Sequence, residues 1–388
     1  MNITCPNCKS VLDVDSSIGG STITCPVCSG RFEVPQAGQG IKVVSRGDGG
    51  AGPSGDSDLA GKFAEVMGVT KPKGFKWKEF FSEVFKKHTK REIESYFMVG
   101  TAETTPDIFG VNTEWPKPWI FARCLLGCVL LYLPIFIILR WFGTSMSSTV
   151  TDLIIIGSFA VPISFALLFF ELNVRRNVSL YEFVRFLFFG GIISIYLLVP
   201  FSPLSDFLAN ALPAGWQDTR AGVTEETTKL LALLFLARGR NYRYIHNGLL
   251  FGAAVGAGFA MFESAGYAYN TLSEGKNWID VIHSRAFFAP VGHVAYSSIC
   301  AGALWRVKGD KPFAFSMLGD WRFLKFFLMG VLLHGFWNSP LLIEQFGVYS
   351  GYVKMAIVGI IAWFVIFSLV QEGLEQIRKE QQDILSNG

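Results

Sequence analysis

The sequence predicts an all-α, polytopic membrane protein with about eight transmembrane helices and a small zinc ribbon at its N-terminus. Of its 388 residues, 51% are hydrophobic and only 17% are charged, whereas a soluble protein carries about 25% charged residues. Apolar stretches of roughly 20 residues, the length that a bilayer requires, recur from Trp119 onward. Two Cys-x-x-Cys pairs predict the ribbon. The net charge of +3 is too small to indicate a nucleic-acid partner.

Residues 1–35 are predicted to form the zinc ribbon. Cys5, Cys8, Cys25 and Cys28 make the two pairs, and a short alternating run follows each pair. Four thiolates at this spacing suit tetrahedral zinc, and metal binding supplies the folding energy that so small a core lacks. The segment resembles the zinc-ribbon fingers of many bacterial proteins; two disulfides in an exported domain are the alternative. Its partner is not specified, and a protein is favoured over nucleic acid.

Two segments separate the ribbon from the membrane region. Residues 36–61 are rich in Gly, Ser, Asp and Pro, which predicts a flexible linker. Residues 62–118 are predicted to form basic, amphipathic juxtamembrane helices, because aromatic residues alternate with lysines between Phe75 and Met98. Their basic side would face lipid headgroups. The alternative is a soluble helix packed against the membrane domain.

The membrane region covers residues 119–372 and is followed by a tail, 373–388. The connections after the second, fourth and sixth spans are rich in basic residues, such as Arg175, Arg240 and Lys308. The positive-inside rule therefore places both termini in the cytoplasm. This reducing compartment favours zinc over disulfides in the ribbon. The predicted spans are 119–139, 150–172, 181–200, 221–237, 247–267, 279–305, 323–342 and 352–370.

The fourth predicted span carries two adjacent acidic residues, Glu225 and Glu226. One acidic residue at mid-depth costs roughly 2.5–3.5 kcal/mol, so a span that served only as an anchor would not contain it. Lys229 follows Glu225 by four residues, which predicts an i,i+4 ion pair and leaves Glu226 without a local partner. An unpaired acid within a span predicts a functional site.

Three further spans bring polar residues to a common level in the outer half of the bilayer. They are Glu263 and Tyr267 in the fifth span, His293 in the sixth, and His334 and Asn338 in the seventh. His334 and Asn338 are four residues apart and therefore share one helix face. We expect the four spans to direct these side chains into one water-bearing cavity.

The fifth span also carries a stripe of small residues. Gly248, Gly252 and Gly256 recur every four residues, and Glu263 falls on the same stripe. Small residues allow a neighbouring helix to approach closely. This face is therefore predicted to pack inward and to keep the Glu263 carboxylate out of lipid.

The polar residues permit two chemistries for hydrolysis within a membrane. Imidazole and carboxylate groups are zinc ligands, and a spare carboxylate can act as general base on a bound water. In a metal-free version a buried glutamate activates water, while His and Asn stabilise the oxyanion. Each residue taken alone could be structural, as a packed histidine or an ion pair. Their common depth on four spans favours a shared site.

These residues resemble the motifs of the PrsW family of intramembrane proteases, which is related to the group of type II CAAX prenyl endopeptidases. The family's Glu-Glu-x-x-Lys is similar to residues 225–229, and its Phe-Glu-x-x-x-Tyr to residues 262–267. The third motif, a His followed by small residues, is similar to His293 with residues 300–303. The fourth, a His with a polar residue four positions later, is similar to His334 and Asn338. The resemblance covers roughly residues 119–370.

The resemblance implies that 119–372 is an intramembrane protease domain in a bacterial inner membrane. Its substrate would be a single-pass membrane protein such as an anti-sigma factor, cut near the outer face. Glu225 or Glu226 would be the general base. The metal ligands, for zinc or another divalent ion, would be Glu263, His293 and His334. Asn338 would be an oxyanion or orienting group, and Lys229 and Tyr267 would support the site. Members of the wider group are argued to use either metal or glutamate chemistry, so the ion stays open.

Two other functions are compatible with this cluster. A transporter or channel could use the Glu and His residues as a proton or cation site. It needs a polar path to the inner face, however, and the cytoplasmic halves of the fourth to seventh spans are apolar. A catalytically inactive relative could serve as a membrane scaffold, although the motif residues are intact.

Overall fold

The computed structural model describes residues 2–4, 11–13, 22–24, 31–33, 59–143, 147–238 and 242–387. The chain divides into two compact units, Met1–Asp58 and Leu59–Gly388. The first unit contains two antiparallel hairpins, in which β1 (Asn2–Thr4) pairs with β2 (Val11–Asp13), and β3 (Thr22–Thr24) with β4 (Arg31–Glu33). The zinc prediction rests on Cys5, Cys8, Cys25 and Cys28, which lie outside the described residues.

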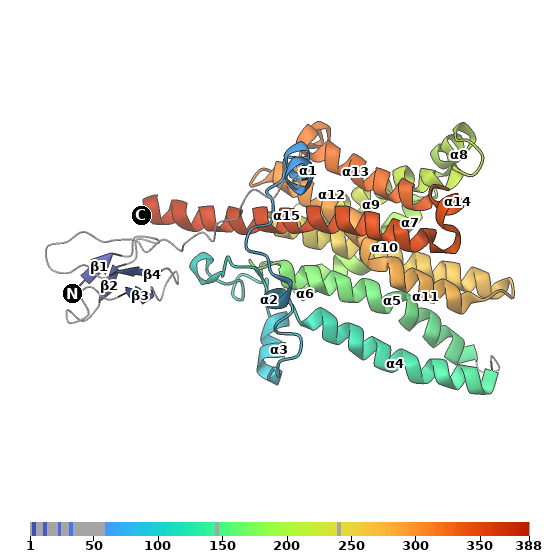
Figure 1. The fold of residues 1–388 in the computed structure, drawn as a ribbon, viewed down its shortest axis with the longest axis horizontal. Helices are drawn as coiled ribbons and strands as arrows, with labels where there is room; N and C mark the ends of the chain where they lie inside the picture. The colour runs from blue at the N-terminus through green and yellow to red at the C-terminus, as the bar shows by residue number, and fades with distance from the viewer. Residues whose placement is uncertain are drawn as a thin grey trace. The chain divides into compact units, whose positions relative to one another are not determined.

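The second unit consists of α-helices, most of which run side by side (Figure 1). This confirms the predicted all-α fold of the membrane region. The first helices are α1 (Leu59–Met67), α2 (Trp77–Phe80), α3 (Lys90–Phe97), α4 (Ile120–Phe142), α5 (Ser147–Leu172), α6 (Leu180–Arg185), α7 (Gly191–Leu197) and α8 (Ser202–Ala211). They are followed by α9 (Ala221–Ala237), α10 (Ile245–Ser273), α11 (Trp278–Phe288), α12 (His293–Lys308), α13 (Trp321–Asn338), α14 (Ile343–Phe346) and α15 (Ser350–Asn387).

Within the described residues, six helical segments are long and apolar enough to cross a membrane, against about eight predicted. The other two predicted spans are also helices, α9 and α13. The first has only 17 residues. The second carries Arg322 and Lys325 in its first turns and His334 and Asn338 in its last, so it is more polar than a lipid anchor. The six segments are Ile120–Phe142, Ser148–Leu172, Leu180–Leu197, Ile245–Ser273, Trp278–Lys308 and Ile343–Ser386.

The sixth predicted span, 279–305, is broken into two helices. α11 ends at Phe288, a 3-10 turn covers Ala289–Val291, and α12 begins at His293. Pro290 has no backbone N–H to donate, and Gly292 leaves the helical conformation with φ −92° and ψ −134°. The break therefore makes His293 the first residue of a helix rather than a residue halfway down one.

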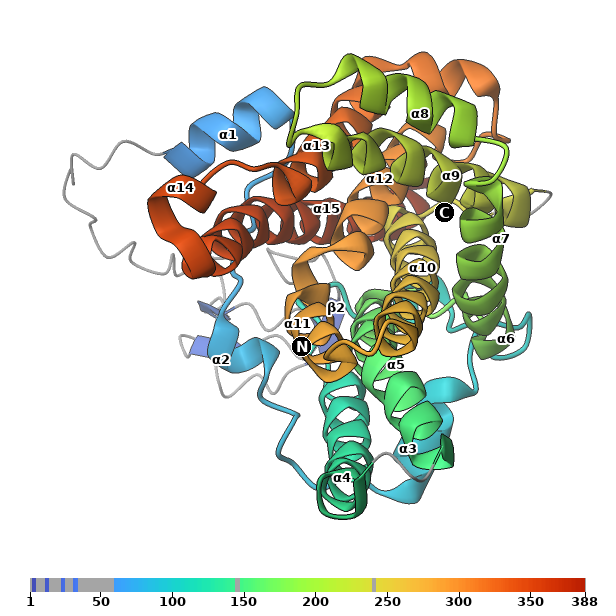
Figure 2. The same ribbon diagram turned by 90° about the vertical axis from the view of Figure 1, so that its right-hand side faces the viewer.

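α10 is the central helix of the second unit. It packs against α5, α7, α9, α11, α12 and α15, which surround it in Figure 2. The predicted glycine stripe allows its contact with α12. A methyl group added to Gly252 would lie 2.1 Å from the backbone oxygen of Ser297, and one added to Gly256 would lie 2.3 Å from that of His293. The close backbone approach therefore fixes the start of α12, and with it His293, against α10.

Gly252→Ala is expected to lower the free energy of unfolding by about 1–3 kcal/mol, because its methyl group would overlap a backbone oxygen of α12. Gly266→Ala in the same helix is the matched control, since no heavy atom outside its own helix backbone lies within 4 Å of the added methyl group. Thermal unfolding of both purified variants in one detergent measures the difference. Equal midpoints would contradict the close approach of α10 and α12.

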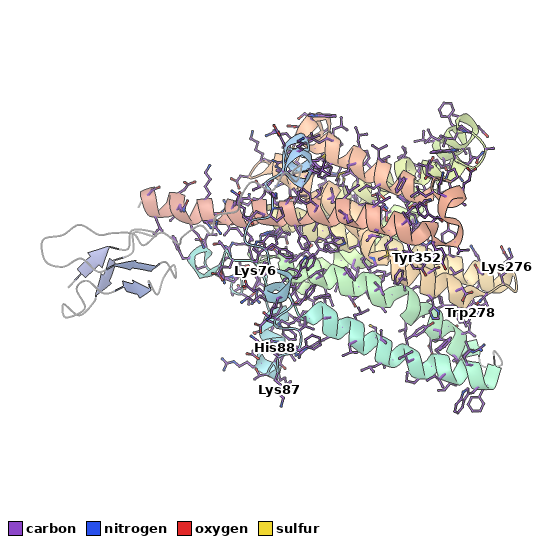
Figure 3. The ribbon with its side chains drawn as sticks, viewed as in Figure 1. Lys76, Lys87, His88, Lys276, Trp278 and Tyr352 are labelled. Carbon is purple, nitrogen blue, oxygen red and sulfur yellow. The ribbon has the colours of Figure 1, made fainter. Side chains whose placement is uncertain are left out.

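The segment that precedes the first span packs against membrane helices through its aromatic residues. Phe80 is buried, and the ring centroids of Phe75 and Phe367 of α15 are 4.6 Å apart. Lys76 and Lys87 are exposed at the end of the helices opposite Lys276, Trp278 and Tyr352 (Figure 3). α2 and α3 are short, and the ring of Phe97 in α3 lies 6.1 Å from that of Phe170 in α5. α1 begins at Leu59, within the predicted linker (36–61).

Candidate active site

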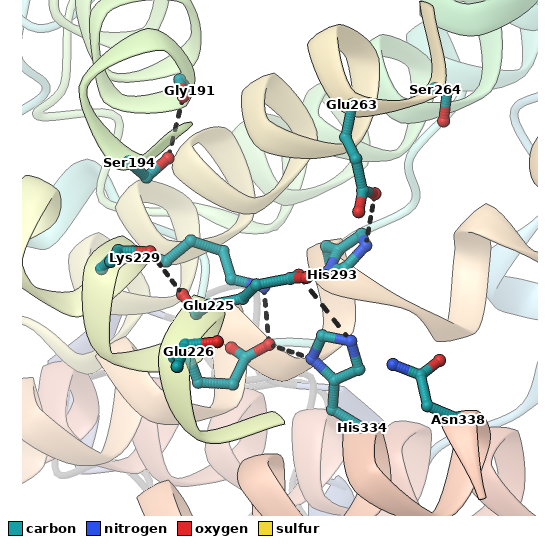
Figure 4. A network of polar contacts seen from close by, with 12 residues as sticks. Gly191, Ser194, Glu225, Glu226, Lys229, Glu263, Ser264, His293, His334 and Asn338 are labelled. Carbon is teal, nitrogen blue, oxygen red and sulfur yellow. Dashed lines mark hydrogen bonds and ion pairs between the residues drawn. The ribbon is translucent and has the colours of Figure 1, made fainter. Parts of the chain in front are cut away.

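One cavity contains most of the polar residues that the sequence singled out. Its volume is about 640 Å³. Figure 4 shows Glu225, Glu263, His293 and His334 pointing toward one another from four helices. The expected convergence of these four helices is therefore observed. Among the lining residues are Glu225 of α9, Glu263 and Tyr267 of α10, His293 of α12, and His334 and Asn338 of α13.

Glu226 and Lys229 form a buried ion pair behind the cavity wall. Lys229 Nζ lies 2.6 Å from Glu226 Oε1, and the two side chains are 2% and 3% exposed. Glu226 Oε1 also lies 2.9 Å from His334 Nδ1. The predicted pairing of Lys229 with Glu225 was wrong. The i,i+3 and i,i+4 positions are both neighbours on a helix surface, and the packing of α9 against α13 selects Glu226.

Glu225 directs one carboxylate oxygen at both histidines. Its Oε2 lies 3.8 Å from His293 Nδ1 and 3.8 Å from His334 Nε2. This oxygen is buried and accepts no hydrogen bond from any described residue. A buried acceptor without a donor costs on the order of 1–3 kcal/mol. Such an atom in a cavity indicates a place for a water, an ion or a substrate group.

The partners of the two histidines assign which ring nitrogens carry a lone pair. A carboxylate can only accept a hydrogen bond. His334 therefore donates from Nδ1 to Glu226 and presents the lone pair of Nε2 to Glu225. His293 donates from Nε2 to Glu263 Oε2, which is 3.1 Å away, and presents the lone pair of Nδ1 to Glu225. Two imidazole lone pairs thus face one carboxylate oxygen.

The ammonium group of Lys229 also contacts His293. Its Nζ lies 2.9 Å from His293 Nδ1 and 4.6 Å from the ring centre of Phe259. Because an ammonium only donates, His293 Nδ1 must be the acceptor. This agrees with the tautomer that Glu263 assigns to the ring.

The donor set fits a divalent metal ion, which would take the lone pair of His293 Nδ1 in place of the Lys229 ammonium. Glu225, His293 and His334 each offer one ligand atom, and these atoms lie within 4.8 Å of one another. Imidazole nitrogen and carboxylate oxygen are zinc ligands, and metal-binding histidines usually donate their other N–H to a carboxylate or carbonyl. Both histidines do so here. Glu263, which the resemblance implied as a ligand, lies outside this group of three and instead contacts His293 from behind.

Arg285 of α11 was not among the predicted site residues. It lines the cavity and forms an ion pair with Glu263. Its Nε also donates to Ser264 Oγ at 2.8 Å, and its guanidinium lies 4.5 Å from the centre of the Tyr267 ring. The available signal was a cationic residue in an apolar segment shortly before His293. Its partners on α10 could not be read from spacing, because a turn separates the two helices.

Three hydrogen bonds hold the end of α13, which carries His334 and Asn338. Asn338 Nδ2 donates to the backbone oxygen of Asp218 at 3.3 Å. Lys354 of α15 is buried and donates to the backbone oxygens of Trp337, at 3.0 Å, and Ser339. A cation here also balances the partial negative charge at the C-terminus of a helix. The last turn of α13 is therefore fixed from two sides.

A comparison with protein families agrees with this geometry. Residues 182–370 match the model of the PrsW family intramembrane metalloprotease. The matched segment contains Glu225, Glu263, His293, His334 and Asn338. No curated protein and no solved structure matches the chain. Residues 182–370 therefore belong to the PrsW family, and the chain is an intramembrane protease.

Proposed function

We propose that the protein cleaves a single-pass membrane protein near the outer face of a bacterial inner membrane, with Glu225, His293 and His334 holding a zinc ion. The observation that carries this proposal is the buried Oε2 of Glu225, which has no hydrogen-bond donor among the described residues and faces an imidazole nitrogen on each side. A substrate of the anti-sigma-factor type follows from the family resemblance.

The residues of the cavity divide the chemistry among them. A zinc ion, when bound, polarises the scissile carbonyl and lowers the pKa of a bound water. Glu225 lines the cavity and has no lysine or arginine partner among the described residues. Its Oε2 would hold the metal, and its other carboxylate oxygen would hold the attacking water, take its proton and return it to the leaving amine. Glu226 is engaged by Lys229 and supports His334 instead. The Asn338 amide donates to the developing oxyanion.

One observation favours a second chemistry at the same residues. Lys229 Nζ contacts His293 Nδ1 and so supplies a positive charge beside Glu225. In this metal-free version Glu225 activates the water, while the Asn338 amide stabilises the oxyanion. The two versions respond differently to a chelator, since removal of zinc would stop only the first.

The direction of two helices supports cleavage near the outer face. α12 begins with His293 and ends with Arg306 and Lys308. α13 has Arg322 in its first turn and carries His334 near its end. The positive-inside rule places the basic ends in the cytoplasm. The histidines then lie toward the outer ends of both helices, and both chain termini are cytoplasmic.

The packing beneath the cavity favours hydrolysis over transport. A proton or cation pathway needs polar groups or water through the inner half of the membrane. On α10 and α12 this region instead contains Phe251, Ile299 and Leu304, all fully buried. Apolar side chains at these positions offer a proton or cation no ligand.

A reconstituted cleavage assay tests the proposal. The full-length protein is placed in liposomes with a panel of tagged single-pass substrates, and the products are mapped by mass spectrometry. We expect a cut in the outer half of the substrate's membrane segment or just outside it, and none with His334→Ala. A cut in the cytoplasmic half, or cleavage that survives His334→Ala, would contradict the proposal. Proton flux without cleavage would support the transporter.

A further inference from the structure

Arg285 ties α11 to one turn of α10 at the cavity. Its side chain is 27% exposed. The three partners of its guanidinium are the Glu263 carboxylate, Ser264 Oγ at 2.8 Å and the face of the Tyr267 ring at 4.5 Å. A guanidinium presents its donors in a rigid plane, so these partners determine its orientation and it determines theirs.

Glu263 transmits this constraint to His293. Arg285 and His293 Nε2 contact the same oxygen, Oε2. No other described side chain donates a hydrogen bond to this carboxylate. Without the guanidinium, one contact with an imidazole would have to hold a long side chain that faces a cavity. The His293 ring and the Glu263 carboxylate could then both rotate.

We propose that Arg285 is a positioning residue of the protease. It fixes the Glu263 carboxylate, and Glu263 keeps the His293 ring with Nε2–H toward itself and the Nδ1 lone pair toward Glu225. The kinetic consequence rests on the proposed function, whereas the ring orientation does not. Groups that orient an active-site histidine in this way typically change metal affinity or activity by about 10–100-fold.

A double-mutant cycle tests the path through Glu263. Arg285→Met is expected to lower kcat by about 10–100-fold with little change in KM. In a Glu263→Gln background the same substitution should lower kcat by less than about twofold, because the carboxylate through which Arg285 acts on His293 is already absent. Arg322→Met is the matched control, since Arg322 pairs with Asp320 at an exposed site. An equal loss in both backgrounds would overturn the proposal, as would a rise in KM alone.

Nitrogen NMR of histidine-labelled, full-length protein in nanodiscs gives a readout that needs no substrate. The His293 signals are assigned by their loss in His293→Gln. Lys229 donates to His293 Nδ1 in both proteins and so keeps the Nε2–H tautomer. We therefore expect a displaced or split Nε2–H signal in Arg285→Met, because the carboxylate that accepts from Nε2 is no longer fixed. An unchanged Nε2–H signal would overturn the role of Arg285. If the protein cleaves no substrate, the proposed function fails, but the NMR comparison still decides the role of Arg285.

Discussion

Glu225→Gln is expected to lower kcat for cleavage by about 10²–10⁴-fold, the range that a general base contributes. Glutamine has nearly the same shape, but its amide cannot take a proton from water and is a poor metal ligand. The wild-type Oε2 has no hydrogen-bond donor among the described residues. Little folding energy should therefore be lost with the charge. Cleavage of a reconstituted substrate and thermal unfolding of the same preparation measure the two effects.

Glu274→Gln is the matched control for this prediction. Glu274 lies just after α10, and its carboxylate is exposed and paired with Lys276. This variant should keep wild-type activity. If Glu225→Gln retained activity within about threefold of the control, Glu225 could not be the group that activates water.

Glu226→Gln is expected to affect stability as well as activity. It would leave the ammonium of Lys229, which is 2% exposed, without its carboxylate partner. Breaking a buried ion pair on one side costs about 3–5 kcal/mol. Weakening the carboxylate contact with His334 Nδ1 should also reduce cleavage by about 10–100-fold. The unfolding midpoint and kcat of the purified variant are the measurements.

The double variant Glu226→Gln/Lys229→Met separates these two effects. Removing the unpaired ammonium should restore most of the lost stability, because replacing both members of a buried pair is often neutral. Activity should stay low, since His334 would still lack its carboxylate. Recovery of full activity by the double variant would contradict the role assigned to Glu226, and so would wild-type stability of the single variant.

Local patterns predicted the helices and one of their contacts. Apolar length located the spans, and the spacing of Gly248, Gly252 and Gly256 identified the face of α10 that meets α12. These features depend on residues close together in sequence, so periodicity reveals them. The break at Pro290 was overlooked because the flanking apolar residues still add up to the length of one span.

The sequence predicted which residues form the site more fully than it predicted which of them contact one another. Sequence placed Glu225, Glu263, His293 and His334 at a common depth, and the structure brings them together. The sequence predicted Glu225 as the partner of Lys229, which was wrong, because contact with α13 selects Glu226. The Arg285–Glu263 pair joins two helices across a loop, and no periodic pattern encodes such a contact.

The most direct test of a shared metal centre is the zinc content of the full-length protein, measured by mass spectrometry. Wild type is compared with a variant that carries His293→Ala and His334→Ala. Any metal held by the four N-terminal cysteines is common to both and cancels in the difference. If Glu225, His293 and His334 hold one ion, the wild type contains one more equivalent of zinc than the variant. Equal zinc content in the two folded proteins would contradict the metal centre.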